Sequence, residues 1–153
     1  METIEKSVEI LNDLIQINND RIAGFEHAAN ELGDNDLDLK VIFQNFKDES
    51  RQNVQALTNT VNQIGGEVET GTTVGGTIHR AWLDVKATFS GHDRKSILEE
   101  CERGEDAIKK AYRDALAYDS GLSPDLKQLV SQQEEGILSA HNRIKALRDS
   151  QFA

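Results

Sequence analysis

Apolar residues recur along residues 4–32 at alternating spacings of four and three, and this pattern constrains the fold more than any other feature of the chain. The positions at that spacing are Ile4, Val8, Leu11, Ile15, Asn18, Ile22, Phe25, Ala29 and Leu32. Such a repeat places its side chains along one face of an α-helix, where they pack against a partner helix. Gly33 follows the last position, as is usual where a helix ends. The chain is therefore predicted to begin with a long helix that other helices cover.

Three further helices are predicted by the same criteria. The second lies between the Asp34–Asp36 turn, which should supply its N-cap, and Gly65-Gly66. The third extends from near 93 to about 118. The fourth begins at Ser123-Pro124. Short turns join the first helix to the second and the third to the fourth. Each of these pairs should therefore form an antiparallel hairpin.

The connection between the second and third helices is long enough to cross the bundle. Its first part, EVETGTTVGGT, is rich in Gly and Thr and is predicted to be a loop. The following IHRAWLDVKATF places Ile78, Trp82, Val85 and Phe89 on one face of a short amphipathic helix. This apolar face should cover a groove of the bundle or a second subunit, so we expect a homodimer. The predicted fold is all-α, an up-down four-helix bundle with one long crossover, forming a single domain over 1–153.

Charge and hydropathy exclude several classes of partner. The formal net charge is −10 and no basic face is apparent, which disfavours binding to nucleic acid. No apolar run approaches the ~18 residues that a membrane span needs, and METIEKSVEILNDL lacks the pattern of a signal peptide. We therefore expect a cytoplasmic protein without a membrane partner. Cys101 is the single cysteine, so an intramolecular disulfide is impossible.

Polar residues interrupt the apolar stripes near the middle of each helix. In ECERGEDAIKKAYRDAL, Glu105 occupies a stripe position between Cys101 and Ile108. Residues of antiparallel helices can be matched in level at ~1.5 Å of rise per residue. This matching predicts a polar layer across the bundle that draws on Asn18 or Asp20, Glu49 with Asn53, Glu102 or Glu105, and Gln133 or His141. Several buried carboxylates cannot all remain charged without cations. They need a bound metal, a basic partner such as Arg51 or Arg103, protons or water.

Several segments resemble known families. GEDAIKKAYRDAL is similar to the third-helix pattern of the ferritin and rubrerythrin superfamily, in which a Glu precedes an Ala and a Tyr at helical spacings. More narrowly, IGGEVETG, GTIHRAW and ILEECERGEDAIKKAY resemble an uncharacterised bacterial family of ferritin-like four-helix bundles. This resemblance covers nearly the whole chain. It implies a ferritin-like fold, and much less about activity, because that family has no settled chemistry.

The ligand pattern departs from that of ferritin-like di-iron proteins. Their site takes one Glu from each of two helices and Glu-x-x-His from each of the other two. Here Gln52 stands three residues after Glu49, and Leu138 stands three residues before His141. Of the six usual ligands, only Glu49 and Glu105 are clearly retained. The candidate metal ligands, for iron, manganese or zinc, are Asp20, Glu49, Glu102, Glu105 and His141.

Two functions are compatible with these features. The first is a non-catalytic bundle, structural or stress-associated, in which the carboxylate layer is a relict. The second is a metal-carboxylate protein that handles oxygen or peroxide. In the first case Glu105→Gln should be neutral or stabilising, because it removes a poorly solvated charge. In the second case the same change should abolish metal retention. For the bundle itself we expect six buried side chains: Ile22, Phe25, Phe46, Leu57, Ile108 and Ile144.

Overall fold

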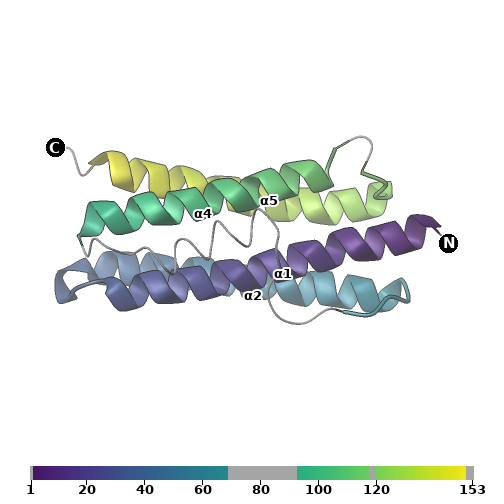
Figure 1. The fold of residues 1–153 in the computed structure, drawn as a ribbon, viewed down its shortest axis with the longest axis horizontal. Coiled ribbons are helices and arrows are strands. Elements are labelled where there is room, and N and C mark those ends of the chain that lie inside the picture. The colour runs from purple at the N-terminus through teal and green to yellow at the C-terminus, as the bar shows by residue number, and fades with distance from the viewer. Residues whose placement is uncertain (1, 69–92, 118–119, 151–153) are drawn as a thin grey trace.

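The computed structural model describes residues 2–68, 93–117 and 120–150, and these residues form four long α-helices arranged as an up-down bundle (Figure 1). The helices are α1 (Glu2–Glu31), α2 (Leu37–Gln63), α4 (Arg94–Ala115) and α5 (Pro124–Asp149). One turn of 3-10 helix, η1 (Asp34–Asp36), joins α1 to α2. The all-α prediction is confirmed.

The helix ends carry the local signals that the sequence predicts. Gly65 follows α2 with a φ of +86°, a conformation that glycine adopts without strain. The Asp93 carboxylate accepts a hydrogen bond from the backbone N–H of Ser96 at the start of α4. The Ser123 hydroxyl accepts one from Leu126 at the start of α5, where Pro124 is the first helical residue. At the N-cap of α2, by contrast, the Asp36 side chain makes no capping bond and instead pairs with Arg94.

The two hairpins pack side by side. α1 packs against both α2 and α4, α4 packs against α5, and α2 contacts α5. In Figure 1, α2 and α4 run in the same direction, which requires the chain to cross the length of the bundle between them. This confirms the predicted ferritin-like topology. The predicted amphipathic helix with Ile78, Trp82, Val85 and Phe89 lies outside the described residues.

The core consists of two apolar clusters, one toward each end of the bundle. One is built around Phe25, Phe43 and Phe46, and the other around Leu14, Leu57 and Ile108. Within the described ranges, no helix is both long enough and apolar enough to cross a membrane.

Five of the six predicted core residues are buried, and Ile22 is only half-buried. The reason is the orientation of α1, whose buried face includes a second repeat that shares every other position with the predicted one and lies one residue earlier at the positions between them. That repeat is Leu11, Leu14, Asn18, Arg21, Phe25, Ala28 and Leu32. Because α1 contacts two neighbouring helices, its buried face is wider than a coiled-coil seam. Ile4, at the start of the predicted seam, is 49% exposed.

Candidate functional site

A buried arginine lies between the two apolar clusters. Arg21 of α1 is fully buried, and its guanidinium donates two hydrogen bonds to Glu105 of α4: Nε to Oε1 at 2.7 Å and Nη2 to Oε2 at 3.0 Å. Its Nη1 donates to Glu49 Oε1 at 2.8 Å and to Ser50 Oγ at 2.9 Å, both on α2. The paired geometry on Glu105 is the strongest that a guanidinium forms with a carboxylate. One side chain of α1 thus joins three helices.

Two aromatic rings flank this guanidinium. Its carbon lies 5.4 Å from the ring centroid of Phe25 and 5.5 Å from that of Phe46. A cation at this distance is attracted to the negative face of an aromatic ring. Because Arg21 is fully buried, protein groups surround its charge.

Neutral polar groups extend the layer to α5. The Asn18 amide donates to the Tyr112 hydroxyl at 2.8 Å, and Asn18 Oδ1 accepts from Ser50 at 2.9 Å and from Asn53 at 3.2 Å. Tyr112 donates in turn to Gln133 Oε1 at 2.8 Å, and Gln133 donates to the Asn53 carbonyl at 3.3 Å. These contacts form a hydrogen-bonded network that spans all four described long helices, as the sequence predicts. Buried polar groups satisfied in this way fix the register of the helices.

Burial and neighbouring charges both shift the pKa values of Arg21 and Glu105. Burial lowers the pKa of Arg21, but the carboxylates of Glu105 and Glu49 outweigh burial and the pKa of the guanidinium is raised. Burial raises the pKa of Glu105, and the Arg21 charge opposes this rise by favouring the carboxylate. Arg21 is therefore a permanent internal cation placed between two carboxylates.

A glycine of α5 lets Glu49 reach this position. A Cβ added at Gly136 would lie 2.9 Å from Glu49 Oε2 and 3.3 Å from its carboxyl carbon. The helix backbone of α5 therefore covers one side of the Glu49 carboxylate, whose side chain remains 33% exposed. A larger residue at 136 would push Glu49 away from Arg21.

The basic partner of the layer differs from the one expected. Arg51 and Arg103 are exposed and pair with Asp48 and Glu100 on their own helices, each at 2.8 Å. Of the alternatives left open by the sequence, a basic partner is present, but it is Arg21 and neither of these two arginines. A signal for Arg21 exists in the sequence: reading the spacings after Asn18 as three and four, instead of four and three, places Arg21 between Asn18 and Phe25 on the buried face.

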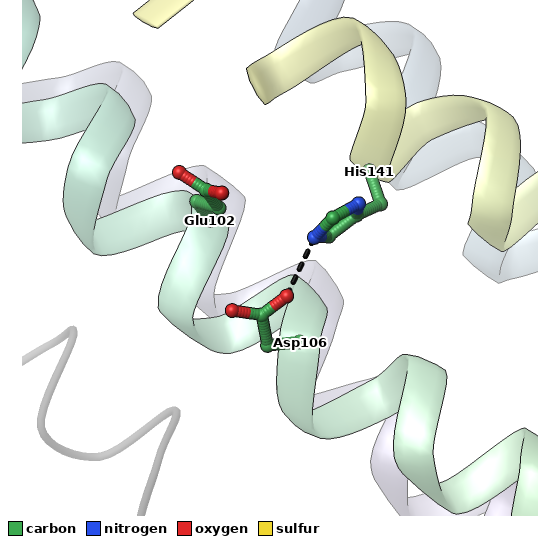
Figure 2. A group of neighbouring side chains, drawn as sticks. All are labelled: Glu102, Asp106 and His141. Carbon is green, nitrogen blue, oxygen red and sulfur yellow. Dashed lines mark hydrogen bonds and ion pairs between the residues drawn. The ribbon is translucent and has the colours of Figure 1, made fainter.

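A second polar group lies between α4 and α5. His141 extends from α5 toward α4, where its Nε2 lies 2.5 Å from Asp106 Oδ1 (Figure 2). Glu102 stands one turn before Asp106 and forms an ion pair with Arg148 of α5. Ligand atoms of Glu102, Asp106 and His141 all lie within 4.8 Å of one another. His141 is buried, Glu102 is half-buried and Asp106 is exposed.

The five candidate ligands thus fall into separate places. Glu49 and Glu105 meet at Arg21, whereas Glu102 and His141 meet beside Asp106. Asp20 is buried on α1 and is not a member of the group in Figure 2. Asp106 was missed as a candidate. Its spacing of four residues from Glu102 is the signal that places both carboxylates on one face of α4.

Comparison with known proteins supports the fold. A family model described as "Domain of unknown function (DUF2383)" matches residues 6–118. A structure described as "Crystal structure of ferritin like, diiron-carboxylate proteins from Bacillus anthracis str. Ames" is similar, with 18% sequence identity and a TM-score of 0.69 over 96% of each chain. No curated protein matches the sequence. At this identity, the likeness establishes a ferritin-like bundle and nothing of its chemistry.

Proposed function

The chain belongs to the family described as Domain of unknown function (DUF2383), and from this premise we propose that it is a non-catalytic ferritin-like bundle, with Arg21 taking the place of metal ions as the cation of its central layer. The proposed role is structural or stress-associated, and the structural role is supported by the polar groups of the layer, which join the helices to one another. The observation that carries this proposal is the contact of one buried guanidinium with both Glu105 and Glu49.

The ligands of the layer do not fit a pair of iron ions. A ferritin-like di-iron site needs four carboxylates and two histidines from four helices. Here α1 contributes the amide of Asn18 and the cation Arg21, and α5 contributes the amide of Gln133. The guanidinium lies between the two carboxylates that such a site would share, where its charge repels a metal ion. Glu49 and Glu105 therefore act as partners of Arg21.

Iron loading of the purified protein tests this proposal. We expect the His141→Ala variant, in which the group of Figure 2 is incomplete, to retain less than one Fe²⁺ per chain after anaerobic loading and gel filtration. Adding Glu105→Gln should leave the iron content unchanged, because Glu105 is already bound to Arg21. Iron is measured by a colorimetric assay and expressed per chain.

The opposite result would support a metal-carboxylate protein that handles oxygen or peroxide with iron or manganese. Retention of two ions per chain, lost on Glu105→Gln, together with oxygen or peroxide consumption by the loaded protein, would contradict a non-catalytic role. The ferritin-like di-iron description of the similar structure makes this the alternative to test.

We also propose that the protein is a homodimer. Its interface would be formed in part by the apolar face predicted from the sequence, which consists of Ile78, Trp82, Val85 and Phe89. Light scattering should give the mass of two chains for the wild type. Trp82→Ala should shift the mass toward one chain, because it removes the largest apolar side chain of that face. A wild-type mass of 17.0 kDa would contradict the dimer.

A further inference from the structure

We propose that Glu102, Asp106 and His141 form a site for one divalent transition-metal ion, separate from the Arg21 layer and confined to α4 and α5. The two carboxylates project from one face of α4 because they are four residues apart. The imidazole of His141 faces them from α5 (Figure 2).

The ligand types select the class of ion. One imidazole nitrogen and two carboxylate oxygens suit Zn²⁺, Fe²⁺ or Mn²⁺, whereas Mg²⁺ prefers oxygen ligands and water. Metal–ligand bonds of about 2.0–2.2 Å hold any two ligand atoms within about 4.4 Å of each other. The present limit of 4.8 Å therefore requires only a small inward movement of the side chains. The contact of 2.5 Å between His141 and Asp106 would open to admit the ion.

The burial of His141 limits how this side chain can bind an ion. The residue is only 6% exposed, and its Nδ1 has no hydrogen-bond partner in the described part of the chain. Its polar interaction is thus directed through Nε2 toward the carboxylates. Nε2 is therefore the nitrogen of His141 that is placed to bind an ion held by the two carboxylates. Because Nδ1 lacks a carboxylate or carbonyl support, we expect weaker binding than at histidines that have one.

Arg148 is the competitor of the metal. It pairs with Glu102 and also with Asp149, at 2.9 Å. An entering ion has to take Glu102 from Arg148, while Asp149 remains available to the released guanidinium. This competition makes a prediction that a structural role for the group does not: removal of Arg148 should strengthen metal binding.

Isothermal titration calorimetry of the chelator-treated full chain measures the stoichiometry and affinity of metal binding at this site. We expect one Zn²⁺ per chain, bound more tightly than Mn²⁺, and no measurable binding of Mg²⁺. His141→Ala and Asp106→Asn should each lower the affinity for Zn²⁺ at least about 10-fold. Asp114→Asn is the matched control, because it removes one negative charge from an exposed position of α4 and should leave the affinity unchanged.

Arg148→Gln should raise the Zn²⁺ affinity about 3-fold to 5-fold, as expected for the loss of a competing ion pair near the surface. Arg143→Gln, an exposed arginine of the same helix, controls for the change in net charge. Absence of Zn²⁺ binding, or binding that survives both ligand variants, would show a hydrogen-bonded histidine–carboxylate pair only. Circular dichroism of each variant establishes that it is folded, so a loss of binding reports on the ligand.

Discussion

Replacing Arg21 with methionine is expected to lower the free energy of unfolding by about 3–5 kcal/mol, because it leaves the carboxylate of Glu105 buried without its partner. Methionine keeps much of the length of the side chain and its contacts with Phe25 and Phe46. The change in unfolding free energy therefore reports mainly on the loss of the Arg21 charge. Denaturant unfolding followed by circular dichroism gives the difference.

Two controls test whether the loss of stability is specific to Arg21 and arises from its pairing with Glu105. Arg51→Met, at an exposed position of α2, should change the stability by no more than about 0.5 kcal/mol. The double variant Arg21→Met/Glu105→Leu should recover much of the loss, since replacing a buried ion pair by apolar residues is often neutral. Equal stabilities of Arg21→Met and the wild type would mean that the layer does not depend on this cation.

The same contact reverses the expected sign for Glu105→Gln. The sequence suggests a neutral or stabilising effect, because Glu105 was expected to be a poorly solvated charge. In the structure its two oxygens accept hydrogen bonds from Nε and Nη2 of Arg21. An amide offers only one acceptor and places its NH₂ group against a donor, so Arg21 loses a partner. We now expect Glu105→Gln to be destabilising.

Phe25→Ala is expected to cost about 3–5 kcal/mol of stability, the second large effect. The ring is fully buried, with its centroid 5.2 Å from that of Phe43 and 5.4 Å from that of Phe46. Its removal would create a cavity beside the Arg21 guanidinium and weaken the attraction between ring and cation. Thermal and denaturant unfolding should both show the loss, with an unchanged helical spectrum at low temperature.

Val41→Ala is the matched control for that change. Val41 lies on the neighbouring helix α2 but is 61% exposed, so its truncation should alter the stability by no more than about 0.5 kcal/mol. Similar losses for Val41→Ala and Phe25→Ala would contradict the assignment of Phe25 to the core. They would instead indicate that the face carrying Val41 is buried in solution.

The helices and their order follow from local features that the sequence displays directly. Asp93, Ser123 with Pro124, and Gly65 each act within one turn of the backbone, so their effects can be read without knowledge of neighbours. The presence of a mid-bundle polar layer is also predictable. Glu105 interrupts an apolar stripe, and a buried carboxylate requires compensation wherever its partner lies.

The identity of that partner is a tertiary property. Arg21 is 84 positions from Glu105 along the chain, and only the packing of α1 against α4 brings them together. Exchanging the order of the three- and four-residue spacings in the α1 repeat replaces Ile22 by Arg21 on the buried face, and both repeats are compatible with a helix. The choice between them depends on the two neighbours of α1. In the same way, only the pairing of α4 with α5 places Asp106 against His141 and Glu102 against Arg148. The physical reason is that ion pairing and metal ligation depend on distances between side chains of different helices, and the packing of the helices sets those distances.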